Sequence, residues 1–487
     1  MQLSSIALFI LTAQCLGLVL GMPHVKDIPK NKVSPRQHRL AYAGLTGMTV
    51  SWNTYQHIQK PTVFYGKSPK RLNKIATSHE SVTYQTSLTY NNHVKIEGLQ
   101  PGTTYYYRVL HDKSSEIYSF TTAKEAGSED EFSFGLVIDM GTMGNLGLSD
   151  TTGEGAGGAL TPGEQTTMQS LAQNVNHFDF LLHPGDLAYA DYWLKEEVQE
   201  YLPLDISKGY QVYEQILNAF YDEIQPVTSK RPYMVGPGNH EADCDNGGTT
   251  DKINNVTYTN SICMPGQTNF TGFKNHFRMP SAESGGRDNF WYSFDYGLVH
   301  FVQYNTETDF GNGLKGPEDG GINGPLGSYE NEQIDWLEKD LSSVNRTKTP
   351  WVIALGHRPW YVAAKKSDRC TTCQEAFEDI LTKNNVDLVL AGHVHNYERL
   401  SPVANNEVDP NGLNNPSAPW YILNGIAGHY DGLDSLVYPL PDYVEYSQDT
   451  AYGWSKFTVH NRTHLTHEFV VSSNNTVLDT ATLYKSH

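Results

Sequence analysis

The chain has 487 residues, which is too many for one ordinary hydrophobic core, so two or more domains are expected. Its formal net charge is −19, and this acidic balance argues against nucleic acid as the main partner, because phosphate backbones are bound by basic surfaces. The negative net charge also repels anions, so an anionic substrate needs a local positive charge at its site.

The first 21 residues form an uncharged, apolar leader. This composition predicts a secretory signal peptide cut near Gly21, and therefore an extracellular protein. A single membrane anchor is the alternative, but Gln14 and the small residues shorten the apolar run below a comfortable span. No later segment has the ~18 unbroken apolar residues that a membrane helix needs, so no membrane association is expected.

An oxidising compartment gives the cysteines and the sequons a specific meaning. Four cysteines follow the leader, and an even number predicts two disulfide bonds, for which three pairings are possible. The favoured pairing is the local one, Cys244 with Cys263 and Cys370 with Cys373. A redox or zinc motif at Cys370-Thr-Thr-Cys373 is the rival, and the lack of a second such motif counts against it. Five Asn-X-Ser/Thr sequons predict N-linked glycans, at Asn255, Asn269, Asn345, Asn461 and Asn474.

Residues 34–122 have the pattern of an all-β domain. Apolar side chains alternate at Met48, Val50 and Trp52, as in a strand with one buried face. The stretch 99–109, LQPGTTYYYRV, resembles the corner of fibronectin type III sandwiches, with Tyr105 as the corner tyrosine. A fibronectin type III-like sandwich is therefore expected here, and the polar run at 122–131 is a candidate linker.

From residue 131 to residue 487, strand-like and helix-like segments alternate. Apolar runs predict strands at 132–138, 178–183, 233–236, 299–304, 351–355, 386–391 and 420–425. Apolar residues at helical spacing predict helices at 210–224 and 329–341. This alternation predicts an α/β layered domain, in which sites lie just past the carboxyl ends of the strands.

Five of these strands end in glycine, in a metal-type side chain, or in both. The first strand is followed by Asp139. The others are followed by Gly185-Asp186-Leu-Ala-Tyr189, Gly238-Asn239-His240-Glu241, Gly356-His357 and Gly392-His393-Val-His395. Each ending alone is more simply a turn, a helix cap or a packed tyrosine. Five together in one domain favour a metal site.

The candidate ligands are Asp139, Asp186, Tyr189, Asn239, His357, His393 and His395. One tetrahedral zinc needs only four ligands, so this larger set fits two ions that share one carboxylate. Two metal ions about 3.5–4 Å apart clamp both the attacking and the leaving oxygen in a displacement at phosphorus. The ligand inventory therefore predicts a two-metal site for phosphate esters.

This constellation closely resembles the purple acid phosphatases, within the wider metallophosphoesterase group. The family's five blocks are Asp, Gly-Asp-X-X-Tyr, Gly-Asn-His-(Asp/Glu), X-X-X-His and Gly-His-X-His, and they match at Asp139, 185–189, 238–241, 354–357 and 392–395. The resemblance covers nearly all of the mature chain, and the tail resembles the fungal branch. It implies a fibronectin-like front domain followed by an α/β layered sandwich of two mixed sheets flanked by helices.

The resemblance also implies the cofactors and the chemistry. Fe(III) would be held by Asp139, Asp186, Tyr189 and His395, and a divalent ion (Zn, Fe or Mn) by Asp186, Asn239, His357 and His393. Tyr189 discriminates between families, because tyrosinate-to-iron charge transfer gives this one its purple colour. The implied activity is acid hydrolysis of phosphate monoesters by a metal-bound hydroxide. His240 would contact the phosphoryl group or protonate the leaving alkoxide, and orienting Asn239 is its alternative role.

In one place the sequence departs from the plant members of the family. These carry two histidines nine or ten residues after the histidine of the fourth block, and Lys366 and Ser367 stand there in this chain. Lys365 or Lys366 is then a candidate to bind phosphate as a point charge. His429, after the strand at 420–425, is a second candidate.

Two other interpretations compete with a monoesterase. The first is a phosphodiesterase or nucleotidase of the same superfamily, which would prefer diesters and lack the purple absorption. The second is a secreted binding or adhesion protein with an inert metal domain, and the intact ligand set argues against it. The sequence leaves the physiological ester open among phytate, nucleotides, sugar phosphates and phosphoproteins. It also leaves open the divalent metal and the oligomeric state.

Overall fold

The structure is a computed structural model that describes residues 29–114, 116–142, 163–194, 206–246, 248–251, 254–310, 328–329, 331–363, 369–428 and 432–487. The expected leader and the candidate phosphate-binding residues Lys365, Lys366 and His429 lie outside the described residues. Over the part of the chain that is described, no helix has the length and apolar character needed to cross a membrane.

The first domain is a sandwich of two four-stranded antiparallel sheets. One sheet contains, in order, β1 (Arg36–Tyr42), β2 (Met48–Thr54), β6 (Tyr90–Ile96) and β5 (Glu80–Val82). The other contains β4 (Lys74–Thr77), β3 (Thr62–Gly66), β7 (Thr104–Val109) and β8 (Tyr118–Thr121). The hydroxyl of buried Tyr105 accepts a hydrogen bond from the backbone N–H of Gln100 at 3.1 Å, which is the contact expected of a corner tyrosine.

The second domain contains two mixed sheets. The six-stranded sheet has the order β11 (Tyr233–Gly236), β10 (Phe180–Pro184), β9 (Phe132–Leu136), β23 (Gly453–Val459), β24 (His464–Val471) and β25 (Val477–Tyr484). The seven-stranded sheet has the order β14 (Tyr292–Tyr296), β15 (Val299–Gln303), β16 (Trp351–Leu355), β17 (Leu388–Ala391), β21 (Trp420–Asn424), β18 (Tyr397–Leu400) and β22 (Val444–Gln448). Strands β9, β10 and β11 run parallel, as do β15, β16, β17 and β21.

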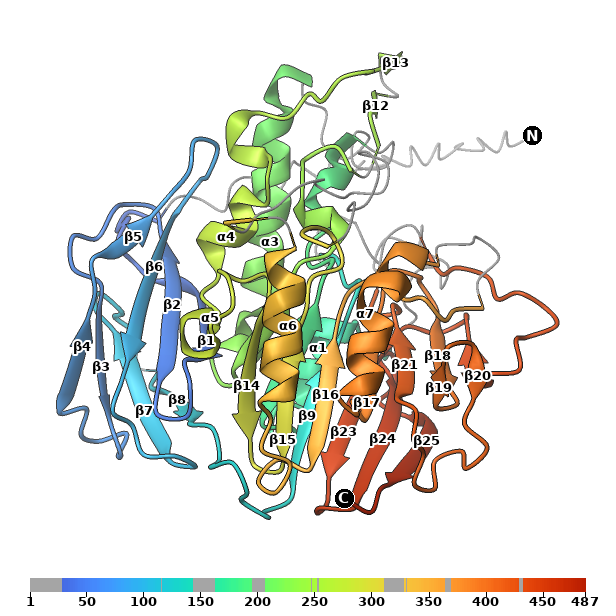
Figure 1. The fold of residues 1–487 in the computed structure, drawn as a ribbon. Helices are drawn as coiled ribbons and strands as arrows, with labels where there is room; N and C mark the ends of the chain where they lie inside the picture. Colours follow the sequence, from blue (N-terminus) through green and yellow to red (C-terminus); the bar gives the residue numbers. More distant parts are fainter. Residues whose placement is uncertain are drawn as a thin grey trace, which may run out of the picture.

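Helices cover the outer faces of these sheets. Figure 1 shows α6 (Glu332–Ser342) and α7 (Thr371–Lys383) lying across the seven-stranded sheet. Helix α1 (Thr167–Gln173) lies against the six-stranded sheet, where Trp454 Nε1 of β23 donates to Ser170 Oγ at 2.8 Å. The other helices are α3 (Gly209–Thr228), α4 (Thr271–His276), α5 (Ser281–Ser284) and 3₁₀ turns at Ala190–Leu194, Ile206–Lys208, Asn239–Glu241 and Pro265–Gln267. Short hairpins pair β12 (Thr250–Asp251) with β13 (Val256–Thr257), and β19 (Val403–Ala404) with β20 (Glu407–Val408).

Aromatic rings hold the two sheets together. The ring of Phe134 stacks on Phe180 and on Phe457, with centroids 5.6 and 4.9 Å away, inside the six-stranded sheet. Phe301 of the seven-stranded sheet meets Phe134 edge-on at 5.2 Å. Edge-to-face and offset pairs of this kind stabilise a core beyond the area that they bury. The sheets are thereby fixed face to face, with their parallel strand ends at a common edge.

The sequence located the central strands and two helices correctly, and it missed the C-terminal strands. All seven expected strands are present, and the helix expected at 210–224 extends over Gly209–Thr228 as α3. Pro226 lies in the last turn of α3, where it leaves the carbonyl one turn earlier without its helical N–H donor. Strands β23, β24 and β25 join the sheet because β23 pairs antiparallel with β9, for example Phe457 with Phe134. A pattern within one segment cannot predict a pairing between segments so far apart in the sequence.

Both disulfide bonds have the favoured local pairing. Cys244 is bonded to Cys263, and Cys370 is bonded to Cys373 at the start of α7. The asparagines of the five sequons are all exposed, at positions 255, 269, 345, 461 and 474. Their glycosylation stays a prediction.

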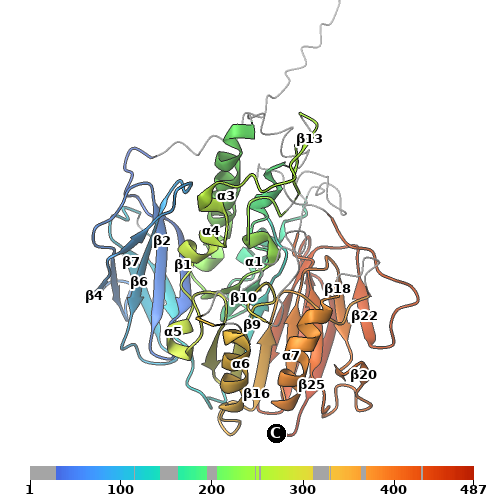
Figure 2. The same cartoon turned by 45° about the horizontal axis from the view of Figure 1, so that its top comes forward.

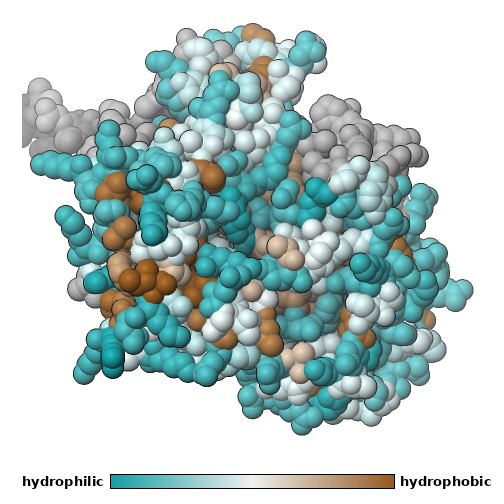
Figure 3. Space-filling model, turned by 60° about the vertical axis from the view of Figure 1, so that its left-hand side comes forward, coloured by the Kyte–Doolittle hydropathy of each residue, from teal (hydrophilic) through white to brown (hydrophobic). Residues whose placement is uncertain are grey.

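The two domains share an interface centred on α3. Figures 1 and 2 show this helix between the sandwich and the remainder of the second domain. Thr228 Oγ1 donates to the carbonyl oxygen of His38 at 2.7 Å, and Gln37 Nε2 donates to Asn218 Oδ1 at 3.1 Å. The outer face of the sandwich is mostly hydrophilic in Figure 3, with small apolar patches. The sandwich also packs on the sheets of the second domain, where the ring of Tyr42 lies 5.7 Å from that of Phe180 and 5.8 Å from that of Phe294.

Glu214 of α3 is a fully buried carboxyl at this interface. Tyr84 Oη and Thr86 Oγ1, both from the sandwich, donate to its two oxygens at 2.8 Å each. Burial raises the pKa of Glu214 to about 7, although these hydrogen bonds oppose the shift. The folded protein therefore binds a proton here more tightly than the unfolded chain does. The interface should be most stable in acid and should weaken as the pH rises from about 4.5 toward 7.

We predict that Glu214→Gln removes this pH dependence. The variant should match the parent near pH 4 and exceed its free energy of unfolding near pH 8 by on the order of 2 kcal/mol, because the parent alone must keep a buried carboxylate. Denaturant unfolding at the two pH values measures the difference. Glu97→Gln is the control, since Glu97 has a side chain 72% exposed and should show no such effect. An equal gain at pH 4 would contradict the prediction.

Candidate metal centre

The parallel strands of both sheets have their carboxyl ends next to one site. Asp139 and Asp186 follow β9 and β10, and the turn that begins at Asn239 follows β11. His357 and His393 follow β16 and β17 in the other sheet. Because the two sheets face each other, these residues meet at their shared edge.

Tyr189 is at the centre of one half of this cluster. Its Oη lies 2.9 Å from Asp139 Oδ1, 3.2 Å from Asp186 Oδ2 and 3.1 Å from His395 Nε2. Tyr189 and the two aspartates are fully buried or nearly so, at 0, 0 and 1% exposure. A phenol, two carboxylates and an imidazole that converge on one point are the donor set that a hard trivalent cation prefers.

A second half shares Asp186. Nε2 of His357 lies 3.0 Å from Asp186 Oδ2, and Asp186, His357 and His393 each offer one ligand atom within 4.8 Å of the others. The buried Oδ1 of Asn239 accepts no hydrogen bond from the described residues. The next residue, His240, donates its backbone N–H to Asp186 Oδ1 at 2.9 Å, which keeps the Asn239 turn against that carboxylate. An amide oxygen without a donor and two imidazoles beside a carboxylate fit a divalent cation.

The backbone is strained where it presents these groups. Four non-glycine candidate ligands have left-handed φ values: Asp139 (58°), Asp186 (53°), Tyr189 (51°) and His393 (70°). Such conformations cost free energy and persist only where the surroundings enforce them, most often at functional sites. The motif glycines permit the close approach: a Cβ on Gly238 would lie 2.2 Å from Asp186 Oδ1, and one on Gly392 would lie 2.4 Å from Asp139 Oδ2.

The protein alone leaves this cluster short of positive charge. Burial raises the pKa of Asp139 above its ordinary value, although His357 opposes the shift. Burial and then the Asp139 carboxylate raise the pKa of Tyr189 well above its ordinary value. Burial also opposes ionisation of Asp186, but His357 and His240 outweigh it and hold the pKa of that carboxyl well below its usual range. A bound cation would favour the anionic form of all three groups, so the residues present fit a metal.

His240 is oriented by a residue that the sequence did not single out. Its Nδ1 lies 2.6 Å from Oδ2 of buried Asp191, and its Nε2 lies 3.8 Å from Asp186 Oδ2. Burial lowers the pKa of His240, but Asp191 and then Asp186 outweigh it and raise that pKa to about 10. Asp191 thereby orients the ring so that Nε2 faces the cluster. Asp191 follows Tyr189 by two residues, and that spacing is the only signal in the sequence that could have identified it.

Glu241 anchors two of the loops that carry candidate ligands. Its carboxylate accepts the backbone N–H groups of Asp186, Leu187 and Gly238, each at 2.8 Å. The loops after β10 and β11 are thereby tied to one side chain. The acidic position of the Gly-Asn-His-(Asp/Glu) block thus acts on the backbone next to the cluster rather than inside it.

Comparison with known proteins agrees with this geometry. Family profiles match residues 35–122 ("Purple acid Phosphatase, N-terminal domain"), 146–397 ("Calcineurin-like phosphoesterase") and 418–480 ("Iron/zinc purple acid phosphatase-like protein C"). "Acid phosphatase A" of Cryphonectria parasitica is 37% identical over 94% of each chain, and "Acid phosphatase" of Aspergillus ficuum is 32% identical over 96% of this chain and 90% of the other. The chain belongs to the purple acid phosphatase family.

Membership of this family makes the protein a metal-dependent hydrolase of phosphate esters, as the sequence blocks predicted. The fold agrees as well: a purple acid phosphatase from yellow lupin (Lupinus luteus) seeds superposes with a TM-score of 0.68, at 22% identity over 93% of this chain and 75% of the other. The iron/zinc description of the C-terminal profile is consistent with the phenolate, carboxylate and imidazole groups gathered here. The expected fold class, a front sandwich followed by two mixed sheets with flanking helices, is confirmed.

We predict that Glu241→Gln loosens the loops around Asp186. An amide has one acceptor oxygen, so the variant loses at least one of three backbone hydrogen bonds, at a cost of about 1–3 kcal/mol in the free energy of unfolding. The metal content of the purified protein should fall at the same time. Thermal denaturation and metal analysis measure the two effects.

Asp409 provides a matched control for this variant. Its carboxylate likewise accepts backbone N–H groups, from Asn411, Ser417 and Ala418, in a loop outside the cluster. Asp409→Asn should lower stability to a similar extent and leave the metal content unchanged. Equal metal loss in both variants would show that general destabilisation, not loop anchoring, releases the metal.

Proposed function

We propose that this chain is a secreted acid phosphatase that hydrolyses phosphate monoesters at a centre of Fe(III) and one divalent cation. The observation that carries the proposal is the position of Tyr189 Oη, within 3.2 Å of Asp139, Asp186 and His395. The proposal includes the leader at 1–21, a front domain at 34–122, a catalytic domain at 131–487, and glycans on the five sequons. It also includes a small phosphate ester, rather than nucleic acid or a membrane, as the partner.

In this proposal the seven candidate ligands divide between two cations that share Asp186. The trivalent site takes Asp139, Asp186, Tyr189 and His395, and the divalent site takes Asp186, Asn239, His357 and His393. When bound, the cations supply Lewis acidity at the phosphoryl group and lower the pKa of water, so that a hydroxide nucleophile is available in acid. Charges of +3 and +2 less three anionic ligands leave about +2, enough to attract a phosphate despite the net charge of −19.

The protein's own contribution to the chemistry centres on His240. Asp191 accepts a hydrogen bond from Nδ1–H, so the second proton of the imidazolium is on Nε2, toward the cluster. As a general acid, Nε2 gives this proton to the alkoxide oxygen as the phosphorus–oxygen bond breaks, and so leaves a neutral alcohol. Between turnovers the neutral imidazole recovers a proton from solvent, and Asp191 stabilises the imidazolium that forms. This role accounts for His240 better than the orientation of Asn239, because its side chain contacts Asp191 instead.

Metal analysis with a visible spectrum tests the proposal directly. The purified protein should contain about one iron and one further metal ion per chain, absorb in the visible range and hydrolyse an aryl phosphate monoester faster than the corresponding diester. Tyr189→Phe should lose the visible band, because no phenolate remains to donate charge to iron. Tyr192→Phe is the matched control, since its ring packs 5.5 Å from Tyr189 and belongs to none of the candidate ligands. A colourless parent, or a preference for diesters, would refute the proposal.

Asp191→Asn tests the assignment of His240. The variant should keep both metals and the visible band, while kcat falls by about 10- to 100-fold. Because Asp191 raises the pKa of His240, the alkaline limb of the pH–rate profile should move to lower pH in the variant. Asp340→Asn removes a largely buried aspartate that lies 2.9 Å from His300, away from the cluster, and should leave the profile unchanged. An unaltered profile in Asp191→Asn would remove His240 from the proton transfer.

A further inference from the structure

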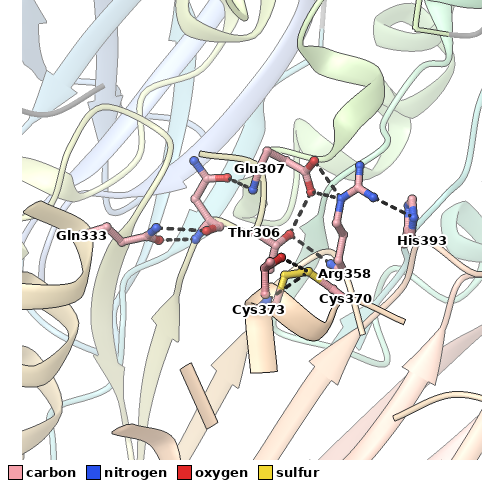
Figure 4. The surroundings of a disulfide bond; sticks show 9 residues. Thr306, Glu307, Gln333, Arg358, Cys370, Cys373 and His393 are labelled. Carbon is pink, nitrogen blue, oxygen red and sulfur yellow. Dashed lines mark hydrogen bonds and ion pairs between the residues drawn. A yellow bond between two sulfur atoms is a disulfide. The ribbon is translucent and has the colours of Figure 1, made fainter. Parts of the chain in front are cut away.

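Arg358 places a buried guanidinium beside a candidate ligand. It directly follows His357, and its Nη1 lies 3.0 Å from Nε2 of His393 (Figure 4). Its Nε donates to both carboxylate oxygens of Glu307 at 3.0 Å each. Arg358 is 7% exposed and Glu307 is fully buried, so this ion pair is shielded from water. Among the seven candidate ligands, His393 is the one whose side chain Arg358 is seen to contact.

The ion pair is held firmly from the Glu307 side. Thr306 Oγ1 donates to Glu307 Oε1 at 2.9 Å and accepts the backbone N–H of Arg358 at 3.0 Å. Asn305 Oδ1 accepts the backbone N–H of Glu307 at 2.8 Å. Figure 4 shows Glu307 on one side of the guanidinium and His393 on the other. The contact with His393 is therefore part of a built network and not the chance position of a long side chain.

The chemistry of the two groups sets up a competition. A guanidinium has only N–H donors, so Nε2 of His393 must be the acceptor, and the ring proton is then on Nδ1. A neutral imidazole has a single in-plane lone pair, and ligation of a cation uses that lone pair. Ligation through Nε2 displaces Nη1 directly. Ligation through Nδ1 moves the ring proton to Nε2, where it meets the N–H of Arg358. With either nitrogen, the hydrogen bond to Arg358 and a bond to a metal exclude each other.

We propose that Arg358 sets the affinity of the divalent half of the centre by competing with the cation for the lone pair of His393. The inference rests on the proposed function, because it takes His393 as a ligand of the divalent ion. Two effects act together, since the cation must break this hydrogen bond and must also bind next to a fixed positive charge. Arg358 should have less effect on the trivalent half, because its side chain contacts His393 and not Asp139, Tyr189 or His395.

The structure offers the displaced guanidinium another acceptor. Arg358 lines a cavity that Tyr304 and Tyr421 also line. The hydroxyl of Tyr304 is buried and has no hydrogen-bond partner among the described residues. An unused hydroxyl thus borders the same cavity as the side chain that a cation at His393 would displace.

Titration with Zn²⁺ tests the proposal. Full-length protein loaded with ferric ion alone is titrated, and the Zn²⁺ dissociation constant is measured by calorimetry, so that no activity is needed. Arg358→Gln should bind Zn²⁺ at least about tenfold more tightly than the parent. The double variant Glu307→Gln with Arg358→Gln avoids leaving a buried unpaired carboxylate, and it should show the same gain. In both variants the tyrosinate absorption reports that the ferric half is intact.

Arg399 and Asp479 provide the matched control, because they form a comparable half-buried pair at 2.7 Å on β18 and β25 without touching a candidate ligand. Arg399→Gln with Asp479→Asn should leave the Zn²⁺ affinity at the parental value. Unchanged or weaker Zn²⁺ binding in both Arg358 variants would overturn the proposal, as would an equal gain in the control. A parent that binds no Zn²⁺ and shows no visible band would instead refute the two-metal function itself, so the two failures are distinguishable.

Discussion

The site depends on one constraint: two buried aspartates, Asp139 and Asp186, converge on the same phenol oxygen. Anionic groups out of water are costly unless positive charge is close, and the nearby histidines supply it only in part. The fold nevertheless forces the groups together, with four of the candidate ligands in left-handed backbone conformations. Bound metal would relieve this crowding, and the description of the matching C-terminal family profile names iron and zinc.

A second layer of acidic residues keeps the arrangement in place without entering it. Glu241 holds the loops after β10 and β11 by their backbone N–H groups, and Asp191 holds the ring of His240. Glu307 holds Arg358, which in turn contacts His393. Both oxygens of Glu241 and of Glu307 accept hydrogen bonds from groups other than the candidate ligands' side chains. Positioning of this kind fixes ligands in advance and reduces the reorganisation required during a reaction.

The front sandwich packs against several parts of the second domain. One of them is α3, the helix that leads into β11 and hence into the Asn239 turn. The buried Glu214 at this contact is best tolerated when it is protonated, which suits a protein that works in acid. The net charge of −19 is likewise compatible with an anionic substrate only because the local charge of a loaded centre is opposite in sign.

The sequence by itself determined the central strands and the identity of the candidate ligands. Both are local signals: apolar runs such as 351–355 and 386–391, each followed by glycine and a metal-type side chain. Tyr189 was found in the same way, from its fixed spacing to Asp186. Each of these signals lies within a few neighbouring residues, and so one sequence is enough to predict the strands and the candidate ligands.

Only the tertiary structure decided how the ligands are supported. The role of Asp191 depends on the direction of one imidazole, and the pairing of Glu307 with Arg358 joins loops 51 residues apart. The addition of β23 to β9 joins the two ends of the second domain. Contacts between distant segments depend on which surfaces pack together, and periodicity within one segment carries no information about its partner. The sequence could therefore name the metal-type side chains, while the residues that hold them emerged only once the sheets were assembled.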